Sequence, residues 1–257
     1  MTHKDVLIWI LLVILSSVTA GSTTIKVAKV DADYSSIQAA INAARPGDRI
    51  EIQAGTYLEN VVLNKTLTLR GIDLPVVDAL GNGSAIALKA DGVALEGIKA
   101  TNSSGYVFRG MPDRFGGAGI LIFSDNNTLT NNIVSSNGGC GIIVHWASIN
   151  NTLVDNNASD NSDKGIFLGG SFNNLTRNIV SNNSKEGVYL DEAMNNILEG
   201  NTVSNNAAGI ILAMSDNNTL RHNQIFGNKE NLADFGQNNS VEASNLVEGG
   251  NIIDIKD

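Results

Sequence analysis

The sequence contains a single cysteine, Cys140, among 257 residues, so no intramolecular disulfide can form and stability must come from packing. Charged residues make up 17% of the chain, against roughly 25% in ordinary globular domains. Basic residues are the scarcer kind, because 17 Lys and Arg face 26 Asp and Glu, giving a net charge of −9. Nucleic acids and anionic membranes are bound by basic patches, so we expect neither as a partner.

Long apolar runs are also scarce. One run, Val6 to Leu15, follows Lys4 and precedes small residues that end before Gly21. This pattern predicts a signal peptide over residues 1–21, because a membrane span needs about 20 apolar residues. An uncleaved anchor is the alternative. We expect no further membrane contact, and we expect a protein that is secreted or held at the cell surface.

A repeat dominates the rest of the chain. Leu, Asn, a small apolar residue, Asn and Gly recur at offsets 0, 3, 5, 8 and 12. Each glycine opens a short apolar phrase such as Gly-Ile-Phe-Leu, and successive glycines are separated by 22 to 24 residues. Such regular spacing, with 42% hydrophobic residues, favours a packed core over disorder. The copies begin at Leu129, Leu153, Leu175, Leu198 and Leu220, and the glycines are Gly119, Gly141, Gly165, Gly187 and Gly209.

The period and the short apolar pieces indicate strands that stack coil upon coil. Pieces of two to four apolar residues are too short for helices and alternate as strands do. A leucine-rich repeat has a similar length but needs a helix-forming half, and here that half is Asn, Ser and Thr. We therefore predict an all-β, right-handed parallel β-helix with coils of about 22 residues. The Asn at offsets 3 and 8 would stack as amide ladders between coils.

The ends and one irregular segment complete the predicted organisation. Residues 35–44 place apolar side chains on one helical face, which predicts a short capping helix within an N-terminal cap, residues 22–48. Ser35 or Ser36 would cap that helix, and strands would begin after it. The β-helix domain then spans residues 49–257. An inserted loop at about 105–118 interrupts the rhythm and could serve binding or simply pack on the coils.

The opening of the repeat region resembles NosD-type β-helix proteins. The residues that carry the resemblance are the run from Asp33 to Ile41, then Pro46-Gly47-Asp48, Gly55-Thr56-Tyr57 and Leu67-Thr68-Leu69-Arg70-Gly71. The later glycine and asparagine phrases resemble parallel β-helix repeats, which also mark a wider group of carbohydrate-binding proteins and sugar hydrolases. The resemblance covers nearly all of the mature chain and implies the fold more strongly than any activity.

Copper delivery is a role linked to this family, but the sequence does not support it. The chain has three His, one Cys and four Met without a copper-ligand spacing, and it has no tight acidic cluster for calcium. We therefore expect no metal and no cofactor. Pectin methylesterases share a similar opening phrase, but their later Asp and Arg motifs are absent.

The strand phrases predict an apolar stripe on the outside of the solenoid. In Gly-Ile-x-Leu, the first and third residues after glycine face the core and the second faces out. An exposed apolar stripe marks a contact surface for a sugar chain, a packed loop or another subunit through self-association. The outward residues are Leu121, Ile143, Phe167, Tyr189 and Ile211.

Polar positions directly after these strands suggest where a ligand would lie. Gly169 and Gly170 would form a floor between a coil with His145 and a coil with Asp191, about 10 Å apart. An acid–base pair of this kind could serve lyase, epimerase or hydrolase chemistry. No Lys or Arg occupies these columns to neutralise a uronate. The candidate ligand-binding residues are Phe123, Trp146, Phe167 and Tyr189, and the candidate catalytic residues are His145, Asp191 and Glu192.

These observations lead to one expected function and two alternatives. The expected function is that of a secreted or cell-surface module binding extracellular carbohydrate along one face, without turnover. The first alternative is an enzyme that modifies polysaccharide by elimination, epimerisation or hydrolysis. The second is a structural surface-layer or adhesion protein whose stripe makes protein contacts.

Overall fold

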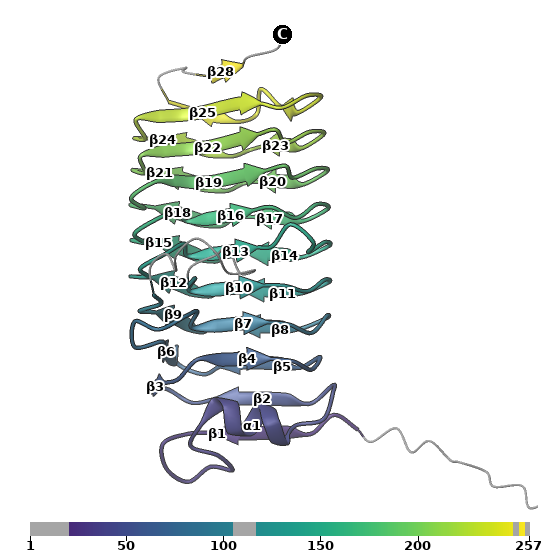
Figure 1. Ribbon diagram of the computed structural model, residues 1–257, viewed down its shortest axis with the longest axis vertical. Coiled ribbons are helices and arrows are strands. Elements are labelled where there is room, and N and C mark those ends of the chain that lie inside the picture. Colours follow the sequence, from purple (N-terminus) through teal and green to yellow (C-terminus); the bar gives the residue numbers. More distant parts are fainter. Residues whose placement is uncertain (1–20, 105–116, 249–251, 255–257) are drawn as a thin grey trace, which may run out of the picture.

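In the computed structural model of Figure 1, the chain winds upward as a tall stack of coils. The structure describes residues 21–104, 117–248 and 252–254. Each complete coil contributes one short strand to each of three parallel sheets that run along the long axis. One short helix, α1 (Ile37–Ala43), completes the secondary structure of the described residues. The molecule is therefore a parallel β-helix, as the repeat predicts.

The first sheet starts at the N-terminal end of the stack. Its strand β1 precedes α1, so strand structure begins earlier than expected, and the predicted cap region contributes a strand to this sheet. The ten strands are β1 (Thr24–Val27), β2 (Arg49–Ile52), β5 (Thr68–Gly71), β8 (Ala94–Glu96), β11 (Thr128–Thr130), β14 (Thr152–Val154), β17 (Asn174–Thr176), β20 (Ile197–Glu199), β23 (Thr219–Arg221) and β26 (Ser240–Val241).

The other two sheets each contain nine strands. The second sheet holds the glycine-led phrases: β4 (Val61–Leu63), β7 (Ile86–Leu88), β10 (Ile120–Ile122), β13 (Ile142–Val144), β16 (Ile166–Leu168), β19 (Glu186–Asp191), β22 (Ala208–Ala213), β25 (Glu230–Phe235) and β28 (Ile252–Asp254). The third sheet consists of β3 (Thr56–Leu58), β6 (Val76–Asp78), β9 (Lys99–Thr101), β12 (Ile133–Ser135), β15 (Asn157–Ser159), β18 (Ile179–Ser181), β21 (Thr202–Ser204), β24 (Gln224–Phe226) and β27 (Leu246–Val247).

Equivalent residues of successive coils lie directly over one another. Leu129 pairs with Leu153, and Leu153 pairs with Leu175, along the first sheet. These leucines are 0–1% exposed and belong to one continuous core cluster. Every coil therefore buries the same positions, which explains why the sequence period persists.

Buried asparagines join the coils at all three corners. At the corner between the first and third sheets, Asn156 donates its backbone N–H and its Nδ2 to Oδ1 of Asn178, at 3.0 and 3.1 Å. The ladders at offsets 3 and 8 confirm the sequence prediction. A further ladder, two residues before each repeat leucine, was not predicted. The ladders are Asn127, Asn151, Asn173, Asn196, Asn218 and Asn239; Asn132, Asn156, Asn178, Asn201, Asn223 and Asn245; and Asn137, Asn161, Asn183, Asn206, Asn228 and Asn231.

The repeated glycines are required by close packing between coils. A Cβ atom placed on Gly165 would lie 2.8 Å from the carbonyl oxygen of Gly187 and 2.3 Å from Cγ1 of Val180. Similar collisions occur at Gly119, Gly141, Gly187 and Gly209, so glycine is required where these coils enter the second sheet.

The helix α1 is held at both ends by side chains from the coils above it. Ser36 caps it, and its Oγ accepts the N–H of Ala39 at 3.3 Å. The Glu59 carboxylate accepts the N–H groups of Ile37 and Gln38 at 2.8 and 3.0 Å. At the other end, Lys65 Nζ donates to three main-chain carbonyls of the helix terminus. The predicted capping helix is thus confirmed, and it closes the N-terminal end of the core.

Candidate functional site

The outer face of the second sheet carries an apolar cluster of its own. Leu121, Ile143 and Phe167 point away from the solenoid core and belong to a separate cluster with Ala118 and Cys140. Phe123, Trp146 and Tyr189 pack against this cluster from its edges. The predicted outward orientation is therefore confirmed, because the flanking residues of the same strands belong to the main core.

The expected exposure of this stripe is wrong for four of its five residues. Leu121, Phe167 and Ile211 are 8% exposed and Ile143 is 2% exposed, whereas Tyr189 is half-buried. Among the described residues, the Trp146 ring meets Phe167 edge-to-face and so covers part of that side chain. Self-association through the stripe stays a prediction, with little of the stripe itself open to a partner.

Five aromatic rings form a continuous chain across four coils. Ring centroids are 4.8 Å apart from Phe123 to His145 and 5.7 Å from His145 to Trp146. Trp146 meets Phe167 edge-to-face at 5.6 Å, and Phe167 stacks on Tyr189 at 6.0 Å. Such separations lie in the range of favourable aromatic pairs. The structure thus brings together all four predicted ligand-binding residues, with Phe167 as the buried centre.

The predicted glycine floor is filled rather than open. A Cβ on Gly169 would lie 2.6 to 2.9 Å from three indole atoms of Trp146, so the indole rests directly on this glycine. A Cβ on Gly170 would lie 1.9 Å from the carbonyl oxygen of Ser148, which places this glycine against backbone. The expectation of an open floor is wrong because indole atoms of Trp146 occupy the space against Gly169.

His145 and Asp191 follow equivalent strand residues two coils apart, as the register predicts. The His145 ring leans towards Phe123 on the preceding coil, and its Nδ1 accepts the N–H of Ala147 at 3.2 Å. That bond leaves Nε2 as the position for a proton. Asp191 ends β19, and Glu192 is exposed with a left-handed φ of 51°.

A lysine that the sequence argument missed lies beside Tyr189. Lys164 Nζ is 5.1 Å from the centroid of the Tyr189 ring and 3.3 Å from Glu186 Oε2. Burial raises the pKa of the Tyr189 phenol, and the nearby Asp191 carboxylate adds to the rise. The phenol is therefore protonated at neutral pH. Lys164 precedes the column glycine Gly165, and stacking that position in register would have revealed it.

Lys164 does not bring a net positive charge to this face. Asp163 Oδ1 lies 3.3 Å from Lys164 Nζ and 3.1 Å from Lys185 Nζ, and Glu186 pairs with Lys164 as well. Two lysines and two carboxylates balance one another. Beside them, burial raises the pKa of the Cys140 thiol to about 12, so the thiol is protonated.

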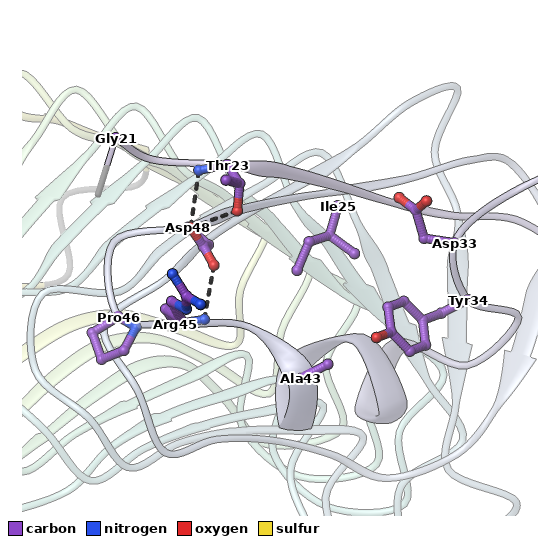
Figure 2. Close-up of a pocket in the computed structure, with 9 residues that line it drawn as sticks. All are labelled: Gly21, Thr23, Ile25, Asp33, Tyr34, Ala43, Arg45, Pro46 and Asp48. Atoms are coloured by element: carbon purple, nitrogen blue, oxygen red, sulfur yellow. Dashed lines mark hydrogen bonds between the residues drawn. The ribbon is translucent and has the colours of Figure 1, made fainter.

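A pocket of about 800 Å³ lies elsewhere, at the N-terminal cap, as Figure 2 shows. Its lining residues belong to β1, to α1 and to the segments beside them, several coils from the aromatic chain. Its Asp48 carboxylate already accepts the N–H and Oγ1 of Thr23 and the N–H of Arg45. These bonds fasten the cap together, so we give this acid a structural role and do not assign the function to the pocket.

Two predicted features fall on residues that the structure does not describe. The signal peptide, 1–21, lies almost wholly outside the described residues, and so does the inserted loop except for residues 117 and 118. Within the described part of the chain, no helix has the length and apolar character needed to cross a bilayer.

Comparison with solved structures supports the fold. Pectate lyase Pel9A matches with a TM-score of 0.67 and 15% identity, over 90% of this chain and 74% of that one. The GH136 lacto-N-biosidase from Eubacterium ramulus matches with a TM-score of 0.63 and 14% identity, over 90% of this chain and 57% of that one. At such low identity these matches establish a shared solenoid and nothing about activity.

A relative by sequence comes from the archaeon Methanothermus fervidus. Its cell surface glycoprotein is 32% identical over 100 residues, which is 37% of this chain and 17% of that protein. The chain therefore spans about a sixth of this relative, and the match concerns only a part of it.

The family whose model matches is described as periplasmic copper-binding protein (NosD), over residues 41–255. The described residues do not fit copper, because they contain no group of three or more His, Cys, Asp or Glu placed to share an ion. The one thiol, on Cys140, is buried and protonated, whereas copper binds thiolate. We therefore derive no copper chemistry. The match covers most of the chain, and on that ground the protein belongs to the NosD family.

Proposed function

We propose that this NosD-family protein is an extracytoplasmic carbohydrate-binding β-helix that holds a glycan along the outer face of its second sheet. The observation that carries the proposal is the aromatic chain from Phe123 to Tyr189, with ring centroids 4.8 to 6.0 Å apart. Pyranose rings stack their apolar faces on such platforms. Trp146 is the central contact, because it lies in the middle of the aromatic chain, its indole rests on Gly169 and its side chain is half-buried rather than buried.

The N-terminal sequence and the similar proteins also support an extracytoplasmic, glycan-binding role. The apolar run Val6 to Leu15 favours export, and both the family description and the archaeal relative refer to proteins outside the cytoplasm. The two structural neighbours carry the names of enzymes that act on polysaccharide or oligosaccharide. Buried Phe167 would position the outer rings rather than touch the glycan.

A glycan array probed with a chain that starts at residue 22 tests the proposal. Binding to a defined set of glycans is expected, and Trp146→Ala should remove it while circular dichroism stays unchanged. Phe226→Ala is the matched control, because Phe226 is a half-buried aromatic on the third sheet, away from this face. Absence of binding to every glycan, or equal binding by Trp146→Ala, would refute the proposal.

A polysaccharide-modifying enzyme is the second candidate, favoured by the Tyr189 environment. The protonated phenol has the Lys164 ammonium 5.1 Å from its ring centroid and the Asp191 carboxylate near enough to raise its pKa, and it could donate a proton, with His145 as the partner base. Turnover on a panel of polysaccharides, abolished by His145→Ala or by Asp191→Ala and weakened by Glu192→Gln, would favour the enzyme. Binding without product formation favours the binding module.

A further inference from the structure

Exposed apolar side chains gather at the corner where the second sheet passes into the first. Ile149, Phe172 and Met194 are 37%, 56% and 41% exposed and occupy three successive coils. We call these three residues the apolar ridge. Phe172 N donates to Met194 O at 3.0 Å, so these turns are hydrogen-bonded neighbours. Coils are separated by about 4.8 Å, which gives the ridge one apolar side chain per step.

Phe172 occupies this ridge at a conformational cost. Its φ is 58°, in the left-handed region, which a bulky aromatic residue rarely adopts. Other coils place asparagine at this position, the type that tolerates the conformation best. Those asparagines are Asn126, Asn150, Asn195, Asn217 and Asn238, all with φ between 56° and 58°. A strained and exposed aromatic that replaces the favoured residue points to a function for its ring.

The groups around Phe172 suit a sugar. Asn150 and Asn195 occupy the equivalent position one coil to either side, and both are exposed. An aromatic face flanked by amide groups offers stacking for the C–H face of a pyranose and hydrogen bonds for its hydroxyls. The ridge is also continuous with the proposed site, because Trp146 belongs to the same turn as Ile149 and lies on Gly169 of the turn that holds Phe172.

The negative charge at this corner disfavours acidic glycans. Five successive segments at this corner, residues 123–127, 145–151, 169–173, 191–196 and 213–218, contain four acids and no Lys or Arg, whereas Lys65 and Lys89 lie in the turns of earlier coils. A polyuronate would meet like charge there without a cation to offset it. The acids are Asp125, Asp191, Glu192 and Asp216.

We infer that the ridge is a subsite for a neutral polysaccharide chain, with Phe172 as its stacking platform, beside Trp146. The inference rests on the proposed function and narrows it, because it excludes the uronate polymers. A linear polymer suits the ridge, since one ring per coil matches one apolar side chain per coil. A protein partner needs about 800 Å² of surface on each side, far more than three side chains offer.

The test compares neutral and uronate oligosaccharides by calorimetry on the chain from residue 22. The probes are cellohexaose, mannohexaose and a xyloglucan oligosaccharide against the hexamers of galacturonate and mannuronate. Phe172→Asn should weaken neutral-probe binding by about tenfold, the loss typical of a stacking anchor. The variant should also fold at least as stably as the parent, because asparagine relieves the left-handed strain.

Leu80→Asn is the matched control, because Leu80 is also apolar, 62% exposed and left-handed with a φ of 57°, at a different corner. It should bind as the parent does. Preferred binding of uronates, or unchanged neutral-probe binding by Phe172→Asn, overturns the inference and leaves the proposed function standing. An oligomer that Phe172→Asn dissociates also overturns it. If no glycan binds and Trp146→Ala changes nothing, the proposed function itself fails.

Discussion

Asn178 makes four hydrogen bonds with one buried side chain. Its Oδ1 accepts the backbone N–H and the Nδ2 of Asn156, at 3.0 and 3.1 Å. Its Nδ2 donates to Leu153 O at 2.9 Å and to Asn201 Oδ1 at 3.0 Å. One amide therefore links three coils and satisfies polar groups that water cannot reach. The asparagine ladders join successive coils at the corners, as the strand hydrogen bonds join them along the sheets.

Replacing Asn178 should be costly because its partners stay buried. Asn178→Ala leaves the buried N–H of Asn156 without its acceptor and removes a donor from the carbonyl of Leu153, and a buried group left unpaired costs about 1–3 kcal/mol. We expect a loss of about 2–5 kcal/mol in the free energy of unfolding, measured by urea titration. Asn182→Gly is the control, since Asn182 is exposed and left-handed. Equal stability of both variants would show that the ladder contributes nothing.

Acid should weaken the ion pairs on the outside of the stack. Arg177 donates to both oxygens of Asp155, at 2.8 and 2.7 Å, and these bonds hold the pKa of Asp155 below its usual range. A lowered pKa in the folded state gives stability that is present above about pH 4 and is lost as pH falls through the folded value. The pKa of Glu199 is lowered by Arg221 in the same way.

Urea midpoints measured from about pH 6 down to about pH 3 should therefore fall, and by less at high salt, since these pairs are largely exposed. Asp155→Asn should flatten part of the pH dependence without distorting the turn, because asparagine tolerates the φ of 54° at this position. If the urea midpoint of Asp155→Asn falls with pH as steeply as that of the parent, this account is contradicted.

The thiol of Cys140 should be inert in the folded protein. Burial raises its pKa to about 12, and thiolate is the reactive form. Ellman's reagent at about pH 8 should detect no thiol until denaturant is added. The raised pKa also means that stability is present below the unfolded value of about 8.5 and declines as pH rises above it. Cys140→Ala should remove that decline, and rapid labelling of the native protein would contradict the assignment.

Most of the fold was predictable because each coil repeats the same physical demands. The glycine column follows from a backbone approach that excludes Cβ, and the Asn at offsets 3 and 8 follow from the need to satisfy buried turns. The third ladder, with Asn151 and Asn173, was missed although its positions repeat as regularly, because the comparison began at the leucine. The strand before α1 was missed because Thr24–Val27 stands outside the repeat.

The site was harder to predict because it depends on side-chain rotamers. The alternation of strand residues fixed which side Phe167 faces, but the position of the Trp146 indole on Gly169 depends on a rotamer. That position brings the ring edge-to-face against Phe167. Lys164 was overlooked because it lies outside the strand phrase. Phe172 left a clear signal, since it interrupts a column of asparagines, but the column is visible only once the turns are aligned coil by coil.

Filling the space on Gly169 should move Trp146 without unfolding the solenoid. The three atoms nearest to a Cβ there all belong to the indole, at 2.6 to 2.9 Å, and the backbone does not adopt a left-handed φ. A chain from residue 22 contains Trp146 as its single tryptophan, so its fluorescence reports on this ring alone. Gly169→Ala should displace the indole from Gly169 towards solvent and so shift the emission to longer wavelength. It should also weaken glycan binding.

Ala147→Ser is the matched control for this displacement, because Ala147 is an exposed neighbour in the turn of Trp146, whereas the three atoms nearest to a Cβ on Gly169 belong to the indole. Its emission and binding should match those of the parent. The unfolding midpoint of Gly169→Ala should change little, since a side chain at the surface can move aside more easily than backbone can. Unchanged fluorescence would show that the indole does not rest on Gly169 in solution. A shifted emission with undiminished glycan binding would show that the glycan does not use this ring.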